Sequence, residues 1–302
     1  MKRDVLSILD LPDLEKVLDL ATEMKNGQTT GKEMTGKSLA MIFEKSSTRT
    51  RVSFEVAMTQ MGGHSIFLSQ NDTQLGRGET VADTARVLGR FVDAIMYRAY
   101  RHTDVLELAK HSRVPVINAL DDMEHPCQIA ADMLTIREHK GTLKGLKLAY
   151  VGDGNNVANS LLLACAMVGM NTSLGCPEGY TIDSNILSKA TSIAKENDSL
   201  VETVTDPFVA VKDADVIYTD TWVSMGDEDQ VSQRKKDLMP YQVNMKLMSA
   251  AKPDAIFMHC LPAHRGDEVT DEVMDGENSA VFDQAENRLH AQKAILRTVI
   301  ND

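Results

Sequence analysis

Short apolar runs alternate along the chain with segments whose apolar residues follow a helical period. The first run, residues 39–43, has the length of a buried strand. It leads without proline or glycine into a segment with apolar side chains at Val52, Val56 and Met58, which is helical spacing. Before this run, residues 14–24 place their apolar side chains on one face. The pattern therefore predicts a helix, a strand and a second helix at the start of the chain.

The alternation continues to the C-terminus. We expect further strands at 64–68, 94–97, 116–118, 146–151, 171–174, 216–219 and 256–259, and helices near 80–91, 103–111, 184–197 and 244–251, with one more ending near Gly169. A last helix, residues 284–300, has no strand after it. Strands that alternate with helices form mostly parallel sheets with helices on both faces. The sequence therefore predicts an α/β protein with two doubly wound domains, each a mostly parallel sheet flanked by helices, and a long C-terminal helix.

The expected boundary between the domains is the segment 141–145, Gly-Thr-Leu-Lys-Gly, because a second strand–helix series begins immediately after it. The predicted domains are residues 1–141, joined by the C-terminal helix 284–302, and residues 142–283. A chain of 302 residues is long enough for two domains with a core each.

Composition and charge narrow the classes of protein. A hydrophobic content of 43% and a charged content of 25% are those of a globular protein. The net charge of −12 argues against general nucleic-acid binding, although a small anion needs only a local basic pocket. No apolar run has membrane-spanning length, and the N-terminus resembles neither a signal nor a transit peptide. The four cysteines fit neither a zinc pattern nor a disulfide scaffold, so we expect a cytoplasmic protein without membrane partners.

The turn between the first strand and the second helix has the chemistry of an anion site. Ser46, Ser47 and Thr48 are N-cap residue types, and the start of a helix offers unpaired N–H groups and the positive end of a dipole. Arg49 and Arg51 add two guanidinium groups, whose planar fork matches phosphate oxygens. The alternative is an ordinary capped helix with exposed arginines.

Other polar residues follow predicted strands, where doubly wound sheets bind ligands. Arg98 and His125 lie just past two strand ends, and Asp220 and Cys260 follow two others. Each has a plainer interpretation: a capping imidazole for His125, a solvated acidic loop around Asp220, and a buried, inert thiol for Cys260. Their common position at strand ends favours a functional role.

The sequence Gly152-Asp153-Gly154 after a strand invites a nucleotide-binding interpretation. However, Val157 stands where the dinucleotide fingerprint has its third glycine. Asn155 and Asn156 place side chains where a pyrophosphate needs bare backbone. We therefore interpret the asparagines as groups for a small polar substrate. There is no Walker-type lysine pattern either.

Four motifs together resemble the signatures of the ornithine carbamoyltransferases, in the same order and at similar intervals over essentially the whole chain. They are Ser47-Thr48-Arg49-Thr50-Arg51, His125-Pro126-Cys127-Gln128, Asp220-Thr221-Trp222-Val223-Ser224-Met225-Gly226 and His259-Cys260-Leu261-Pro262. The first motif is shared with the wider transcarbamoylase family, which includes aspartate carbamoyltransferase. The third and fourth motifs point to ornithine as the acceptor.

The resemblance implies transfer of the carbamoyl group of carbamoyl phosphate to the δ-amine of L-ornithine, giving L-citrulline and phosphate without a metal or organic cofactor. By this similarity the carbamoyl phosphate contacts would be Ser47, Thr48, Arg49, Thr50, Gln74, Arg98, His125, Gln128, Cys260, Leu261 and Arg288. The ornithine contacts would be Asn156, Asp220, Ser224 and Met225. The first predicted domain would bind carbamoyl phosphate and the second ornithine.

The resemblance also implies an assembly. Gln74 would reach the phosphate site of a neighbouring subunit, so a homotrimer, or a multiple of trimers with shared active sites, is expected. One departure from aspartate carbamoyltransferase supports this role of Gln74. Gly78 stands roughly where that relative has a lysine that reaches across the subunit interface, so Gln74 would take its place. A place in arginine metabolism is implied, whether in arginine biosynthesis, the urea cycle or arginine breakdown.

The reaction sets the expected roles. Negative charge builds on the carbonyl oxygen during attack, and Arg98, His125 and Thr50 are the expected donors to it. Cys260 would orient ornithine in a pocket of low dielectric constant that favours the neutral amine, and would not act as a nucleophile, because no base is placed to activate it. The departing phosphate would accept the amine proton. We expect carbamoyl phosphate to bind first and residues 224–226 to act as a lid.

Three other functions stay open at this point. Another transcarbamoylase could use putrescine, acetylornithine or aspartate as its acceptor. An NAD-dependent dehydrogenase would suit a doubly wound domain, although the fingerprint glycine is missing. A binding protein without catalysis would leave Arg49, Arg98 and His125 without a reaction to serve.

Overall fold

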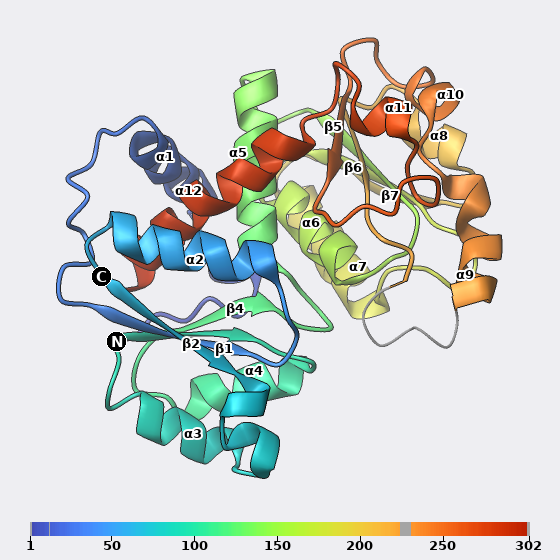
Figure 1. Cartoon of the computed structure of the whole chain (residues 1–302). Helices are drawn as coiled ribbons and strands as arrows, with labels where there is room; N and C mark the ends of the chain where they lie inside the picture. Colours follow the sequence, from blue (N-terminus) through green and yellow to red (C-terminus); the bar gives the residue numbers. More distant parts are fainter. Residues whose placement is uncertain (1, 12, 224–230, 301–302) are drawn as a thin grey trace. The chain divides into compact units, whose positions relative to one another are not determined.

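The chain divides into two compact units. The computed structural model describes residues 2–11, 13–223 and 231–300 (Figure 1). Unit 1 comprises Met1–Leu134 and Glu286–Asp302, and unit 2 comprises Thr135–Ala285. Both divisions fall inside helices, α5 (Pro126–Lys140) and α12 (Val281–Ile300), so unit 1 is built from two separate parts of the chain.

Unit 1 contains a four-stranded parallel sheet in the order β2-β1-β3-β4. Its strands are β1 (Ser38–Phe43), β2 (His64–Ser69), β3 (Ala94–Arg98) and β4 (Val116–Leu120), and its other helices are α1 (Leu14–Lys25), α2 (Thr48–Gln60), α3 (Val81–Leu88) and α4 (His102–His111), with short 3₁₀ helices at Ile8–Asp10, Gln70–Asp72 and Leu75–Arg77. Figure 1 shows α2 on one face of the sheet and α3 and α4 on the other.

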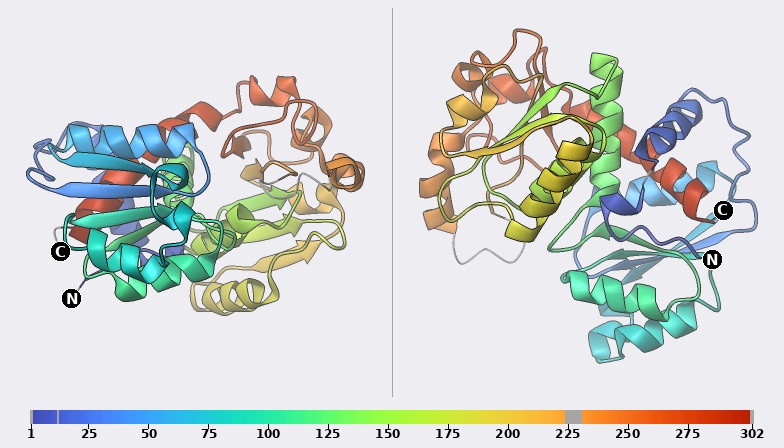
Figure 2. Two further views of the ribbon diagram at one scale, coloured as in Figure 1. Left: turned by 60° about the horizontal axis from the view of Figure 1, so that its bottom comes forward. Right: turned by 180° about the vertical axis from the view of Figure 1, so that it is seen from behind.

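The period of two along the strands explains this layering. Ala40 and Ile42 on β1 and Ile95 and Tyr97 on β3 pack into a core with residues of α3 and α4. The intervening residues, Arg98 among them, therefore face the side of α2. The C-terminal helix joins this side, where Lys25 at the end of α1 donates a 2.9 Å hydrogen bond to Asn287, and Figure 2 shows the two helices next to each other from behind.

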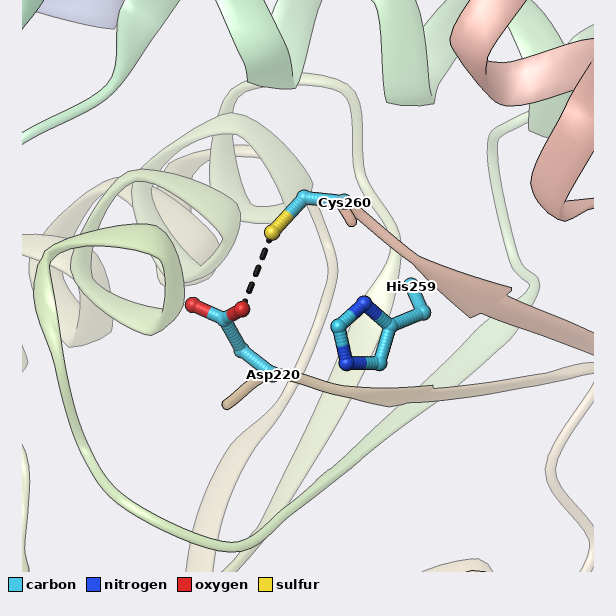
Figure 3. A group of neighbouring side chains, drawn as sticks. All are labelled: Asp220, His259 and Cys260. Carbon is cyan, nitrogen blue, oxygen red and sulfur yellow. Dashed lines mark hydrogen bonds between the residues drawn. The ribbon is translucent and has the colours of Figure 1, made fainter. Parts of the chain in front are cut away.

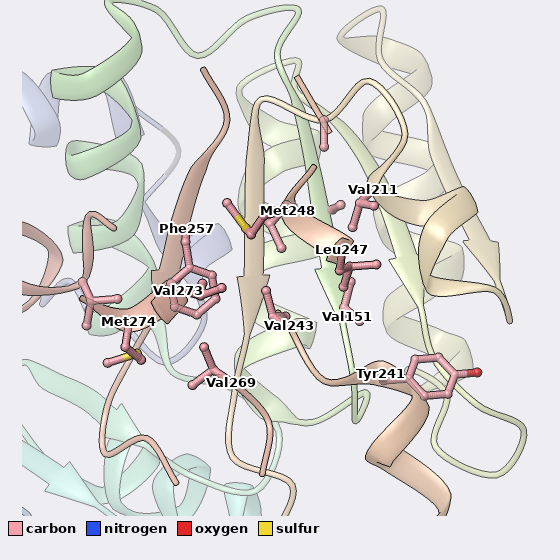
Figure 4. Close-up of a cluster of buried hydrophobic side chains, with 14 residues drawn as sticks. Val151, Val211, Tyr241, Val243, Leu247, Met248, Phe257, Val269, Val273 and Met274 are labelled. Carbon is pink, nitrogen blue, oxygen red and sulfur yellow. The ribbon is translucent and has the colours of Figure 1, made fainter. Parts of the chain in front are cut away.

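Unit 2 contains a five-stranded parallel sheet in the order β7-β6-β5-β8-β9. Its strands are β5 (Lys147–Val151), β6 (Asn171–Gly175), β7 (Val201–Val204), β8 (Val216–Thr219) and β9 (Ile256–His259), and its helices are α6 (Asn156–Met167), α7 (Ser184–Glu196), α8 (Pro207–Val211), α9 (Val231–Leu238), α10 (Met245–Met248) and α11 (Asp271–Met274), with a 3₁₀ helix at Met239–Tyr241. Val151 and Phe257 pack with Leu247 and Val273 to form the core on one face (Figure 4).

The predicted fold class is confirmed, with two parallel, doubly wound sheets and a long final helix. Gly62 has φ +79° directly after α2, as expected for a glycine that ends a helix. The face predicted for α2 is partly wrong: Val52 is 50% exposed, and the buried residues are Thr50, Phe54, Ala57 and Met58.

Five elements of unit 2 were not expected or differ from expectation. Strand β7 and the short helices α8, α9 and α11 were not predicted, and the helix expected over 244–251 is limited to Met245–Met248. None of the helices in the described part of the chain is both long and apolar enough to cross a membrane.

Candidate functional site

Each sheet has one point where the strand order reverses, and this is where doubly wound sheets bind ligands. In unit 1 the reversal lies between β1 and β3, and in unit 2 between β5 and β8. In the described part of the chain, Arg98, Asp220 and Cys260 lie at the carboxyl ends of these strands or of their neighbours. Each unit thus holds a half-site of its own.

The turn from β1 into α2 forms the first part of the half-site in unit 1. Ser47 is the N-cap of α2, and its hydroxyl accepts a hydrogen bond from the backbone N–H of Thr50 at 3.3 Å. Thr48 is exposed and Arg49 is half-buried. A capped helix start with free N–H groups in its first turn has the geometry of an anion site.

Arg98 lies beside this turn. It is the last residue of β3, and it pairs in register with Phe43, the last residue of β1. Its backbone carbonyl accepts a hydrogen bond from Glu44 at 3.0 Å, which fixes the start of the turn against β3. Arg98 is 6% exposed, so its guanidinium group is held in a largely desolvated position.

Arg51, in contrast, does not join the anion site. Its guanidinium group forms an ion pair with Glu55 at 2.9 Å and lies 3.8 Å from the ring centroid of Phe67. The prediction that two guanidinium groups converge on the turn is therefore wrong for Arg51. Its place four residues before Glu55 on one helix explains the pairing.

His125 precedes α5 and is buried. Burial, together with the nearby Arg288 and Arg98 guanidinium groups, holds the pKa of His125 well below its usual value. The imidazole is therefore neutral at physiological pH, and it can donate a hydrogen bond without adding charge.

Arg288 connects three helices of unit 1. From α12, it donates a hydrogen bond to Gln128 Oε1 on α5 at 2.5 Å and another to Thr50 Oγ1 on α2 at 3.2 Å. Three predicted site residues that are far apart in sequence are thus brought into direct contact.

The loop before His125 contains residues that the sequence reasoning missed. The buried carboxylate of Asp121 accepts hydrogen bonds from the backbone N–H groups of Met123 and Glu124, both at 2.8 Å, and contacts His102 Nδ1 at 2.6 Å. These contacts hold the backbone that leads into His125. Two adjacent aspartates after a strand were a signal for such a turn, because aspartate accepts local backbone bonds.

Gln74 lies outside this cluster of contacts. It is exposed and stands just before the 3₁₀ helix Leu75–Arg77, where its backbone carbonyl accepts hydrogen bonds from Arg77 and Glu79. Its role toward a neighbouring subunit stays a prediction.

Asp220 is the centre of the half-site in unit 2. Its carboxylate accepts a hydrogen bond from Cys260 Sγ at 2.9 Å (Figure 3). It also accepts from Asn155 Nδ2 at 2.7 Å and from the backbone N–H of Thr221 at 2.8 Å. The ends of β5, β8 and β9 thus converge on one carboxylate. Cys260 and Leu261, predicted as carbamoyl phosphate contacts, belong to unit 2.

Asn155 has two tasks that the sequence did not reveal. Its side-chain carbonyl caps α6 by accepting from Val157 and Ala158, and its amide holds Asp220. Asn156, the predicted ornithine contact, is the first residue of α6.

Gly154 is required by close packing rather than by a nucleotide. A side chain there would meet the backbone of Thr181 and Ile182 at 2.6 Å. The segment around Thr181 therefore covers the turn where a dinucleotide would place its pyrophosphate.

One group of side chains within the described ranges has the composition of a metal site. Ligand atoms of Asp220, His259 and Cys260 lie within 4.8 Å of one another (Figure 3). However, His259 Nδ1 accepts from the backbone of Leu261 at 2.9 Å, and Nε2 lies 3.2 Å from Glu268. Because both ring nitrogens are engaged, the arrangement suits a positioned Cys260 better than a metal ion.

Two predicted ornithine contacts, Ser224 and Met225, lie outside the described residues, as does the whole predicted lid, residues 224–226. The chain next to them is anchored by Arg234 on α9, which donates to the backbone carbonyl of Trp222 at 2.6 Å and forms an ion pair with Asp153. Arg234 was not recognised from the sequence, where it stands in a polar run without a motif.

Comparison with known proteins gives matches over the whole chain. Residues 3–138 match the family model described as the aspartate/ornithine carbamoyltransferase, carbamoyl-P binding domain, and residues 144–299 match the Asp/Orn binding domain of the same family. The ornithine carbamoyltransferase of Methanobrevibacter smithii is 58% identical over 97% of this chain and 98% of its own length. That of Picrophilus torridus is 54% identical over the full length of both chains.

Solved structures agree with the sequence matches. The ornithine carbamoyltransferase from Pyrococcus furiosus superposes with a TM-score of 0.96 at 54% identity, over 99% of this chain and 97% of that one. The anabolic enzyme from Campylobacter jejuni superposes with a TM-score of 0.94 at 41% identity, over 100% of this chain and 99% of that one.

Proposed function

This chain belongs to the aspartate/ornithine carbamoyltransferase family, and from that premise we propose that it is an ornithine carbamoyltransferase. It transfers the carbamoyl group of carbamoyl phosphate to the δ-amine of L-ornithine and releases L-citrulline and phosphate. The observation that carries this function is the contact of Arg288 with both Thr50 and Gln128 beside the anion-binding start of α2. Full-length relatives named for the same activity support it.

The phosphate of carbamoyl phosphate binds at the start of α2 in this proposal. Backbone N–H groups of the first turn, the hydroxyl groups of Ser47 and Thr48 and the guanidinium group of Arg49 donate to its oxygens. The helix dipole adds to the attraction without requiring a change in conformation. The carbamoyl part lies toward Arg98, His125 and Gln128.

Catalysis depends on the charge that develops on the carbonyl oxygen. Arg98, Thr50 and the neutral imidazole of His125 donate hydrogen bonds to this oxygen, and their fixed positions avoid reorganisation during attack. The δ-nitrogen forms a bond to the carbonyl carbon, the bond from carbon to the phosphate oxygen breaks with its electron pair on oxygen, and the phosphate takes the proton from nitrogen.

Ornithine binds in unit 2 in this proposal. The Asp220 carboxylate pairs with the α-ammonium group, and Asn156, Ser224 and Met225 contact the amino-acid head. Cys260, held by Asp220, orients the δ-amine in surroundings that favour its neutral form. We also propose that carbamoyl phosphate binds first, which product-inhibition kinetics of an ordered mechanism would support.

We further propose that the enzyme assembles as a homotrimer, or as a multiple of trimers, and works in the cytoplasm. Gln74 would complete the phosphate site of a neighbour. Relatives named anabolic and catabolic both occur at similar identity, so the proposal covers arginine metabolism in either direction.

An acceptor panel tests the proposed function. The purified protein is incubated with carbamoyl phosphate and, in turn, ornithine, acetylornithine, putrescine and aspartate, and the ureido product is measured. We expect citrulline to form at a rate at least about 100-fold above the other products. Putrescine and acetylornithine lack the free α-amino acid head that would pair with the groups around Asp220, and aspartate has that head but no side-chain amine to attack the carbonyl carbon. Equal or faster reaction with another acceptor would contradict the assignment.

A further inference from the structure

We propose that Asp132 is a positioning residue for this reaction: it fixes the amide of Gln128, and through Arg288 it sets the direction of the hydrogen bonds that reach Thr50. The inference rests on the proposed function and adds a residue that no motif of the sequence includes. It depends only on contacts within unit 1.

Asp132 lies one helical turn after Gln128 on α5. Its Oδ1 accepts a hydrogen bond from Gln128 Nε2 at 2.8 Å, and both side chains are buried, with exposed fractions of 0% and 1%. A spacing of four residues places the two side chains on the same face of a helix. Carboxylates are rarely buried unless their oxygens accept hydrogen bonds. The hydrogen bond from Gln128 is therefore part of what allows Asp132 to be buried.

The chemistry of the neighbours permits one orientation of the Gln128 amide. A carboxylate only accepts hydrogen bonds and a guanidinium group only donates them. Gln128 stands between Asp132 and Arg288, so its nitrogen must face Asp132 and its oxygen must face Arg288. An amide without such neighbours could adopt either orientation.

The same reasoning extends to Thr50. Arg288 Nη2 lies 3.2 Å from Thr50 Oγ1, and the Ser47 hydroxyl donates to the same oxygen at 3.1 Å. Thr50 Oγ1 thus accepts twice, and its own proton points elsewhere. In the proposed reaction the Thr50 hydroxyl uses this proton to donate a hydrogen bond to the carbonyl oxygen of the carbamoyl group. Asp132 therefore acts on the reacting atoms through Gln128, Arg288 and Thr50, and it touches no substrate itself.

A plainer role is also conceivable for a buried carboxylate, namely to balance the charge of Arg288 and stabilise the fold. The two roles differ in their dependence on Gln128. A positioning residue that acts through Gln128 loses its effect on turnover once Gln128 is removed, whereas a residue that only stabilises the fold does not.

The test compares D132N, Q128A and the double variant D132N/Q128A with the parent protein. For each protein, kcat, the KM for carbamoyl phosphate and the midpoint of thermal unfolding are measured. D132N keeps the shape of the side chain but allows the Gln128 amide to turn over. We expect its kcat to fall about tenfold, as for loss of an oriented charged hydrogen bond, with a smaller change in KM. In the Q128A background the same substitution should change kcat by less than about twofold.

A matched control is D215N. Asp215 is also a buried aspartate, which accepts from the backbone of Lys147 and pairs with Lys252. It lies directly before β8, at the end of the unit 2 sheet opposite to that unit's half-site. D215N should lower the thermal midpoint and leave kcat unchanged. If D132N does not fold, D132S replaces it, because serine keeps an acceptor without the charge.

The outcomes separate this inference from the proposed function. Citrulline formation by the unsubstituted protein supports the function whatever the variants do, and its absence would overturn the function. With an active parent protein, an unchanged kcat in D132N would overturn the positioning role. The positioning role would also be overturned if D132N lowered kcat by the same factor in the parent protein and in the Q128A variant.

Discussion

The arginines in and near the half-site of unit 1 have different tasks, because their surroundings differ. Arg98 is buried at the end of β3 beside the turn that begins α2, whereas Arg51 is engaged by Glu55 and Phe67. Arg288 is fixed by its contacts with Gln128 and Thr50. At the scale of the residue, burial and partners decide which guanidinium groups can serve the reaction.

Replacing Arg98 by alanine should lower turnover by roughly 10²–10³-fold, because one preorganised donor to the carbonyl oxygen is lost. Steady-state citrulline formation measures the effect. The control is Arg101→Ala: Arg101 is exposed and paired with Asp104 on the surface, so its loss should leave turnover unchanged. Unchanged turnover in Arg98→Ala would remove Arg98 from the catalytic groups.

Replacing Cys260 tests whether its sulfur is a nucleophile. Cys260→Ser replaces the thiol by a hydroxyl that can also donate to Asp220, and we expect it to retain activity within about tenfold of the parent, chiefly with a raised KM for ornithine. Loss of a covalent nucleophile would cost about 10⁴-fold or more in turnover. A loss of that size, together with a carbamoyl adduct detected by mass spectrometry, would contradict the orienting role.

At the scale of secondary structure, long apolar runs gave reliable predictions and short polar elements did not. Strands β1, β3 and β5 are buried on both faces and read as continuous apolar segments. Strand β7 lies at the edge of its sheet with two exposed residues, and α9 is almost entirely polar, so neither has a clear period. A hydrophobic period arises only where one face of an element is buried, and β7 and α9 bury few side chains.

The half-sites were predictable to the extent that their residues end a strand or begin a helix. Ser47, Arg98 and Asp220 could be found in this way. The two adjacent aspartates after β4 were a signal for the turn at Asp121. Asp132 and Arg234 could not be found, because charged residues in a helix or a polar run are normally solvated, and only the folded chain shows that they are buried.

The His102–Asp121 contact predicts a dependence of stability on pH. The hydrogen bond to Asp121 raises the pKa of His102 above its ordinary value of 6.5. The folded protein then binds this proton more tightly than the unfolded chain, so the contribution is complete below pH 6.5 and is lost as the pH rises through the raised pKa.

Thermal unfolding of the parent and of His102→Asn over a range of pH measures this contribution. The difference in midpoint between the two proteins should be largest near about pH 5.5 and should shrink toward about pH 9. His111→Asn is the control, since its imidazole is paired with Glu107 on the surface of α4. A difference that grows with pH would contradict the assigned sign.

At the scale of the whole molecule, the two units have the same architecture and divide the substrates in the proposed function. Each places its half-site at the reversal point of a parallel sheet. Unit 1 supplies cationic groups and a helix start, and unit 2 supplies the Asp220 carboxylate with its partners. The same fold thus presents opposite charges at equivalent positions.

The proposed sharing of sites between subunits can be tested by complementation. Gln74→Ala and Arg98→Ala should each be nearly inactive alone, whereas a mixture of the two, dissociated and reassembled, should regain activity because some sites combine unsubstituted residues from different chains. Each variant reassembled alone is the control. A mixture with no regained activity would contradict a contribution of Gln74 to a neighbour's site.

The division of unit 1 into two parts of the chain has a consequence for synthesis. The turn at Ser47 emerges from the ribosome early, but Arg288 emerges only after all of unit 2 has been made. A nascent or truncated polypeptide that ends before α12 therefore carries the turn at Ser47 without the arginine that contacts Gln128 and Thr50. In the proposed function, competence to bind carbamoyl phosphate is acquired only with the final helix.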